Sequence, residues 1–300
     1  MESRLNLKQK IVKSYKSNIF YLVFRDPDVY FLKLFNRTLS IGFFTLILSY
    51  VYIHTGLHEI KIPSTMHGLI GVVIGLLLVF RTNTAYDRWW EGRKSLSSLS
   101  TAISFFSIKF NSSVYGTNRD SAIFTESAKA INTDLINFLI DLKQYLQNSA
   151  MSEHIIHVSD SFHLGQMKYM EKILFRLHEL ERNNIISARD VAMLESSVNH
   201  LLEHSNVCER IKNTPIPIAY SLHIKMSILI YLITLPFGLF YDLGLWATPV
   251  VMLVFYLIAG IEIISSEIEN PFAGDPNDLP TEEIVNSIIG SIHQDNNTNE

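Results

Sequence analysis

The chain has 300 residues, of which 48% are hydrophobic, a formal net charge of −4 and one cysteine. The negative charge gives no basis for nucleic-acid binding. A single cysteine excludes a disulfide framework, and a thiolate metal cage, within one chain. We therefore expect Cys208 to be a small packed residue. The high hydrophobic content indicates that membrane-spanning segments are combined with polar ones.

The first segment, residues 1–37, is basic. It holds eight Lys and Arg residues and lacks the uninterrupted apolar core of a secretory signal peptide. We expect it to remain in the cytoplasm as a basic amphipathic helix. Such a helix lies along a membrane surface or packs on the body of the protein, and the sequence does not distinguish the two arrangements.

Four apolar windows without charged residues predict four membrane crossings. The most regular of them, residues 62–80, spans about 28 Å as a helix, close to the thickness of the hydrocarbon layer. The connections within each pair of windows are short, so both hairpins are expected on the same side of the membrane. The windows are residues 38–58, 62–80, 226–241 and 243–261.

The distribution of Lys and Arg predicts the orientation. Fifteen of them lie in residues 81–212, whereas the two hairpins together hold only Lys61. The termini and the long insert are therefore expected in the cytoplasm. Residues 262–300 contain nine acidic residues and no Lys or Arg, which leaves the last crossing without a basic anchor. Acidic residues count little in this rule.

The insert, residues 81–222, has a helical pattern of apolar residues, such as Ile173, Leu177 and Leu180, with Ser187 as an expected N-cap. We predict an all-α membrane protein with four transmembrane helices and a cytosolic helical bundle. The expected divisions are a basic N-terminal helix (1–37), two transmembrane helices (38–80), a cytosolic helical domain (81–222), two further transmembrane helices (223–264) and a cytosolic C-terminal segment (265–300).

The second window carries two different stripes. Val72, Leu76 and Phe80 recur every four residues on one bulky stripe. Small residues on the neighbouring stripe allow another helix to approach closely, so several copies can pack through them around a shared axis. Equally, both stripes can simply pack against other helices. The small residues are Gly68, Gly71 and Gly75.

Two prolines fall within the last two windows. Pro236 lies inside the third window and Pro249 near the start of the fourth. Proline removes a helical hydrogen bond, so we expect both helices to be kinked or broken near their outer ends.

No motif for catalysis or for a resident cofactor is evident. The chain lacks a phosphate-binding loop between a strand and a helix, and it lacks a nucleophile elbow. His154, His157 and His163 have no adjacent cysteine or carboxylate that completes a metal site. We expect a protein that is not an enzyme and that holds no cofactor.

The turn over residues 269–280 is crowded with oxygen donors and contains three prolines. Carboxylates and carbonyls at such a turn are suited to a hard cation such as calcium. Capping and rigidity alone also explain its composition.

Three separated motifs stand out along the chain. They are Phe80-Arg81-Thr82-Asn83-Thr84-Ala85-Tyr86-Asp87-Arg88-Trp89-Trp90-Glu91, Cys208-Glu209-Arg210 with Thr214-Pro215-Ile216-Pro217, and Glu269-Asn270-Pro271-Phe272 with Asn277-Asp278-Leu279-Pro280. Together they resemble the bestrophin family, specifically its bacterial branch. The resemblance covers nearly the whole chain and implies a homopentameric ion channel with a central pore in the plasma membrane, here a bacterial inner membrane. Its partners would be other copies of the chain, the lipid bilayer, and chloride or other small ions.

The resemblance also implies roles for individual residues. Val72, Leu76 and Phe80 match the hydrophobic neck of the family's pore, and Arg189 falls near its second, cytosolic constriction. A ring of guanidinium groups at that constriction would favour anions.

The turn matches part of the family's calcium clasp, at Glu267, Asn270, Asp275 and Asp278. The acidic run typical of animal members is interrupted here by neutral residues. We therefore expect the turn to brace the subunit interface and not to confer calcium gating.

Two other functions are compatible with the sequence. One is a cation (sodium) channel of the same architecture, since residues 81–212 contain fifteen acidic and fifteen basic residues. The other is a membrane-anchored scaffold or signalling protein. A coupled carrier is less consistent with the sequence, because the four windows contain no charged residue.

Overall fold

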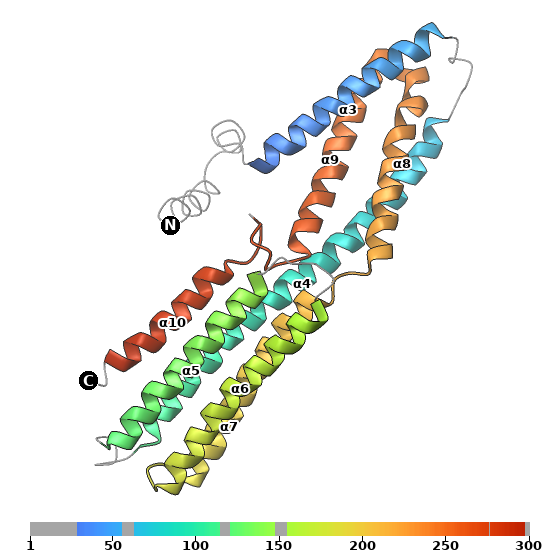
Figure 1. Ribbon diagram of the computed structural model, residues 1–300. Helices are drawn as coiled ribbons and strands as arrows, with labels where there is room; N and C mark the ends of the chain where they lie inside the picture. The colour runs from blue at the N-terminus through green and yellow to red at the C-terminus, as the bar shows by residue number, and fades with distance from the viewer. Residues whose placement is uncertain (1–28, 56–62, 115–120, 148–154, 276, 298–300) are drawn as a thin grey trace. The chain divides into compact units, whose positions relative to one another are not determined.

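The computed structural model describes residues 29–55, 63–114, 121–147, 155–275 and 277–297. Every regular element in these ranges is a helix, which confirms the all-α class (Figure 1). Residues 1–28 of the predicted N-terminal helix lie outside the described residues. Helix α3 (Val29–His54) already includes residues 29–37, so these are continuous with the first apolar window.

The chain divides into two compact units. The first, the apolar unit, comprises residues 1–80 and 219–263. The second, the bundle unit, comprises residues 81–218 and 264–300. Each unit is described separately below.

The apolar unit contains α3, the first part of α4 (Ser64–Ser112), most of α8 (Ile218–Leu243), the short 3-10 turn η3 (Gly244–Trp246) and most of α9 (Ala247–Ile268). Among the residues that the structure describes, three helical stretches are long and apolar enough to cross a membrane: residues 34–54, α4, and the run from α8 through α9. Only 22 to 28% of their most apolar windows is buried within the chain. Apolar side chains that face outward at this density need a lipid environment, so the chain is a membrane protein.

The sequence led us to expect a kink or a break in the third apolar window at Pro236. Helix α8 is not broken there. The helix continues to Leu243, and the Pro236 side chain is buried. Pro249 lies in the first turn of α9, where a backbone amide has no partner within the helix. The reversal of the chain between the two helices is made instead at η3, where Gly244 adopts φ +54°.

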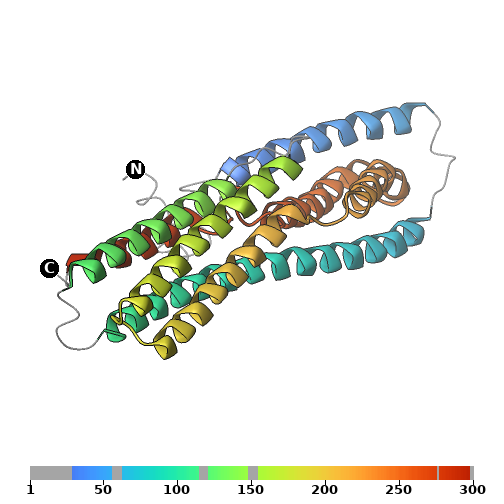
Figure 2. The ribbon, with the colours of Figure 1, turned by 60° about the horizontal axis from the view of Figure 1, so that its bottom comes forward.

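The bundle unit contains the second part of α4 together with α5 (Ala122–Gln147), α6 (Ile155–Arg182), α7 (Ala188–Asn213) and α10 (Thr281–Asn297). Helices α5, α6 and α7 lie side by side (Figure 2). Their inward residues form one continuous apolar core, which includes Cys208. Burial raises the pKa of the Cys208 thiol to about 12, so the expected packed role of this residue is confirmed.

The N-cap predicted from the sequence is also present. Ser187 accepts a hydrogen bond from the backbone N–H of Asp190 and begins α7. Helix α10 was not predicted. Its residues Val285, Ile288 and Ile292 are buried in the same core as α5, and the spacing of three and four places them on one face.

Candidate functional site

The bulky stripe of α4 is exposed within the chain. Val72, Leu76 and Phe80 are 72, 54 and 55% exposed, whereas Ile74 and Leu78 on the other side of the same helix are 3 and 2% exposed. The buried pair packs into the small core of the apolar unit. The stripe is therefore largely exposed in a single chain, where lipid, another copy of the chain or a pore can face it.

The neighbouring glycine stripe serves two purposes. A side chain at Gly71 would come within 2.8 Å of the Tyr231 hydroxyl of α8, so this glycine permits close packing within the chain. A methyl group at Gly68 or Gly75 would meet no atom of a neighbouring segment within 4 Å, so both positions lie open. The packing interpretation is thus correct for Gly71, while the other two glycines remain accessible to a further helix.

Arg88 connects three segments of the bundle unit. Its Nε donates to the carbonyl oxygen of Glu269 at 3.0 Å. Its two terminal nitrogens donate to the carbonyl oxygens of Thr214 at 2.6 Å and Ile211 at 2.5 Å. Burial lowers the pKa of Arg88, and the carboxylates of Glu269 and Glu91 act in the opposite direction. The planar guanidinium fits three carbonyls that a lysine could not reach together.

Other contacts reinforce the same junction. Arg81 is 1% exposed, and its guanidinium lies 3.5 Å from the Glu269 carboxylate. The hydroxyls of Thr82 and Ser265 lie 2.7 Å apart. Residues of all three sequence motifs therefore meet beside the part of α4 that follows Arg81. Their separation in the sequence did not indicate that they would be neighbours.

The turn after α9 is closed by its own polar groups. Trp89 Nε1 donates to the carbonyl oxygen of Asn277 at 3.1 Å, and the Asn277 amide donates to Glu267 Oε2 at 2.6 Å. Asp278 Oδ2 accepts from the backbone N–H groups of Gly274 and Asp275 at 2.6 and 2.7 Å. Gly274 has φ +96°, a conformation that favours glycine.

The apolar part of this turn docks on α4. Phe272 is fully buried, and together with Leu279 it lies over Gly92. A methyl group at Gly92 would stand 3.1 Å from the Phe272 ring and 3.2 Å from Leu279. The turn is therefore fixed by both its polar closure and an apolar contact.

The candidate calcium ligands are partly engaged by hydrogen-bond donors of the chain itself. They are Glu267, Asn270, Asp275 and Asp278. The first of these carboxylates is engaged by an amide and the last by two backbone N–H groups. Among the described residues, no group of three or more His, Cys, Asp or Glu side chains is placed to hold a metal. Burial is the main cause that raises the pKa of Asp278 to about 6. The same burial disfavours the charged carboxylate that a cation ligand requires.

Arg189, the candidate for the cytosolic constriction, lies in the first turn of α7 and is exposed. A cation at a helix N-terminus opposes the helix dipole. Within the part of the chain that the structure describes, Arg189 makes no ion pair, and its exposure is also what a solvated surface charge would show.

Comparison with known proteins identifies the class. The model of the family described as bacterial and fungal bestrophin proteins matches residues 11–294. The chain belongs to this bestrophin family, which the motifs had indicated.

Named relatives and solved structures agree with this assignment. The chain is 35% identical over 251 residues to a voltage-dependent anion channel-forming protein of Nostoc, covering 79% of this chain and 80% of that protein. It is 30% identical over 245 residues to the voltage-dependent anion channel-forming protein YneE of Escherichia coli, covering 79 and 77%. A crystal structure of a bacterial bestrophin homolog from Klebsiella pneumoniae matches with a TM-score of 0.76 at 20% identity, covering 87% of this chain and 98% of that one.

Proposed function

We propose that the protein is an anion channel in which five copies of the chain surround a central pore in the plasma membrane. The names of its relatives support anion conduction. The single observation that carries the proposal is the exposed stripe of Val72, Leu76 and Phe80. Chloride is the expected physiological ion, passing without coupling to another solute.

The stripe gives the proposed pore its neck. Five copies of each residue form stacked apolar rings around the axis. A narrow apolar constriction excludes water and ions until the helices move apart. The open glycines Gly68 and Gly75 would then receive the helix of the next copy.

In the proposed topology the chain crosses the membrane four times and both termini are cytoplasmic. The 26 residues of α8 and the 22 residues of α9 are each long enough for one crossing. The excess of Lys and Arg in residues 1–37 and 81–212 supports this orientation.

Arg189 is proposed to line a second constriction in the cytosolic part of the channel. Its exposure, and its place at a helix N-terminus that does not favour a cation, support this role. The permeability ratio of chloride to sodium should fall by at least severalfold in Arg189→Glu, as measured from reversal potentials. A ratio equal to wild type would remove Arg189 from the conduction path.

The neck is tested in planar bilayers with purified protein. Replacing Val72, Leu76 and Phe80 together by alanine widens the constriction and reduces its apolar surface, so the open probability should rise severalfold. A matched control replaces three exposed apolar residues of α8 and α9. These are Leu229, Ile233 and Leu253. A triple neck variant that conducts like this control and like wild type contradicts the proposed neck.

A sodium-selective channel is the second candidate, favoured by the equal numbers of acidic and basic residues in residues 81–212. Bulk charge does not decide selectivity, whereas a bi-ionic potential across liposomes does. A chloride-selective reversal potential supports the main proposal, and a sodium-selective one supports the alternative. Protein that passes no current in any salt would instead point to the membrane-anchored scaffold.

A further inference from the structure

A groove runs between α4 and α7 in the bundle unit, apart from the proposed neck and from the Arg88 junction. Its volume is about 420 Å³. Two helices supply its walls, and nearly all of its lining side chains are polar. The lining residues are Ser98, Thr101, Ala102, Phe105 and Lys109 from α4, and Ser196, Ser197, His200 and His204 from α7.

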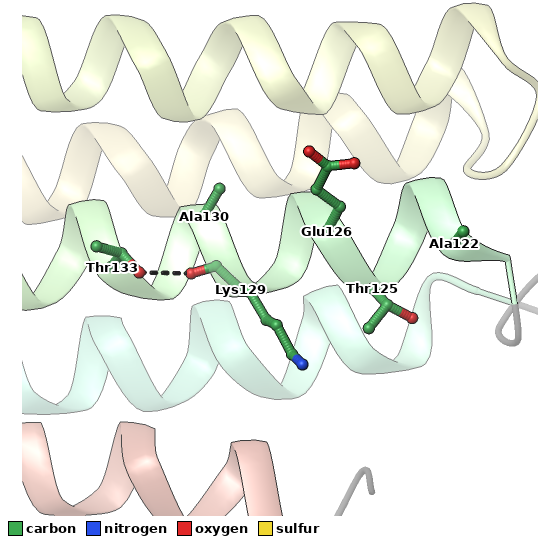
Figure 3. A pocket seen from close by; sticks show the side chains of 6 residues that line it. All are labelled: Ala122, Thr125, Glu126, Lys129, Ala130 and Thr133. Carbon is green, nitrogen blue, oxygen red and sulfur yellow. Dashed lines mark hydrogen bonds between the residues drawn. The ribbon is translucent and has the colours of Figure 1, made fainter.

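The groove differs from the other large depression in the bundle unit. That depression, of about 630 Å³, is lined by one helix only, α5 (Figure 3). It contains a carboxylate, Glu126, together with Lys129, and Thr133 is occupied by a bond to the Lys129 carbonyl oxygen. The lining of the α4–α7 groove contains no carboxylate. Its polar groups are hydroxyls, imidazoles and one ammonium group. The hydroxyls of Thr101 and Ser197 donate to carbonyl oxygens of their own helices, so the donors that the groove offers are chiefly Lys109, the two imidazoles, Ser98 and Ser196.

The ammonium group of Lys109 is held in place on one wall. Its Nζ donates to Ser197 Oγ at 3.3 Å and to the carbonyl oxygen of Met193 at 3.5 Å. It also lies 5.5 Å from the centre of the Phe105 ring. No carboxylate lies within ion-pair distance of Lys109 among the residues described in the structure. The Lys109 ammonium group is thus held by neutral partners, and its positive charge can still attract an anion.

The imidazoles of His200 and His204 line the same groove, with ring centres 6.4 Å apart. The nearby carboxylates of α7 are engaged at the surface. Glu203 lies 3.3 Å from His200, and Glu195 lies 3.1 Å from His178. Neither carboxylate contributes to the lining of the groove. Among the lining residues, Lys109 therefore supplies the one formal charge, a positive one, although the chain as a whole is negative.

We infer that this groove binds a small oxyanion, of the phosphate class, through the Lys109 ammonium, the two imidazoles and the surrounding hydroxyls. Several donors that converge from two helices can satisfy the several acceptor oxygens of such an anion at once. A volume of about 420 Å³ accommodates a hydrated tetrahedral oxyanion. This binding function is separate from the proposed conduction of ions, because binding in the groove requires neither a pore nor ion flux.

A different ligand has to be separated by experiment. His200, Glu203 and His204 have the spacing His-x-x-Glu-His, which is also found in zinc peptidases. The fixed Lys109 ammonium disfavours a cation in the groove, and no third protein ligand completes a metal set among the described side chains. Zinc is therefore the competing outcome of the test.

The test is calorimetric titration of the full-length detergent-purified protein with inorganic phosphate, in a chloride-free buffer at constant ionic strength. Wild type should bind phosphate saturably. Lys109→Gln should weaken binding at least tenfold, and Lys109→Arg should restore part of it. Lys129→Gln, on the α5 depression, is the matched control and should bind like wild type. No saturable binding in wild type, or equal affinity in Lys109→Gln, overturns the inference.

Two further measurements keep the result interpretable. If Lys109→Gln does not fold, Ser98→Ala combined with Ser196→Ala removes one hydroxyl from each wall of the groove and should weaken binding severalfold; unchanged affinity counts against the site. Zinc that binds through His200 and His204, while phosphate does not bind, also overturns the inference. Because no current is measured, failure here is distinct from failure of the proposed channel function.

Discussion

Polar groups are used differently in the two units. In the apolar unit, some side-chain hydroxyls bond to their own helix: Thr38 donates to the carbonyl oxygen of Leu34 at 2.8 Å, and Thr234 to that of Ile230 at 2.9 Å. A longer-range polar contact there is the ion pair of Lys225 and Glu262 at 3.7 Å. In the bundle unit, Arg88 joins segments that are more than 100 residues apart in the sequence through three carbonyl oxygens. A helix that faces lipid can satisfy a hydroxyl on its own backbone, whereas a helical bundle can use a polar junction to fix the segments that connect its helices.

The largest expected effect concerns the junction in the bundle unit. Arg88→Gln removes the charge and most of the donors that serve three carbonyl oxygens, so the bundle unit should lose about 2–4 kcal/mol of stability. Thermal unfolding in detergent measures the loss. Arg93→Gln, an exposed arginine on the same helix, should change stability by less than about 0.5 kcal/mol. Equal melting of the two variants would mean that the junction is not what holds the turn.

A smaller effect is expected in the apolar unit. Gly71→Ala places a methyl group 2.8 Å from the Tyr231 hydroxyl, so the Tyr231 side chain or the two helices must move, at a cost of about 1–2 kcal/mol. Gly75→Ala meets no atom of a neighbouring segment and should leave the subunit's stability unchanged or slightly higher. Thermal unfolding measures the loss of packing within the chain, and size-exclusion chromatography measures the loss of association between copies. A Gly75→Ala variant as unstable as Gly71→Ala would contradict this division of the glycine stripe.

The smallest effect is a pH dependence of the turn. The pKa of Asp278 is about 6 in the folded chain, above the ordinary 3.8, so the folded state holds this proton more tightly than the unfolded state. The contribution of this proton to the free energy of unfolding is therefore greatest below about pH 4 and is lost as the pH rises through 6. Solvent screening limits it to about 1 kcal/mol.

Asp278→Asn stays neutral and can still accept both backbone N–H groups. Its melting temperature should therefore gain on that of wild type as the pH is raised from 4 to 7. Glu282→Gln, an exposed carboxylate in the first turn of α10, is the control. A difference between Asp278→Asn and wild type that stays constant over this pH range would show that Asp278 does not titrate as described.

Much of the architecture could be predicted from the sequence, for physical reasons. Charge-free runs of about twenty residues indicate membrane helices because a bilayer tolerates few other structures. The N-cap at Ser187 was predictable because capping depends on neighbouring residues only. Helix α10 was missed because its three buried residues stand among polar ones, and the pattern has meaning only once α5 is known to lie beside it.

The sequence by itself determined that this is an all-helical membrane protein, since hydrophobic length and periodicity act locally along the chain. The tertiary structure decided which residues are partners: Gly71 with Tyr231, Arg88 with three distant carbonyls, and Lys109 with α7 across a groove. It also paired the carboxylates of Glu267 and Asp278 with amide donors of the same turn. Such pairings depend on contacts between segments remote in the sequence, which no local pattern encodes.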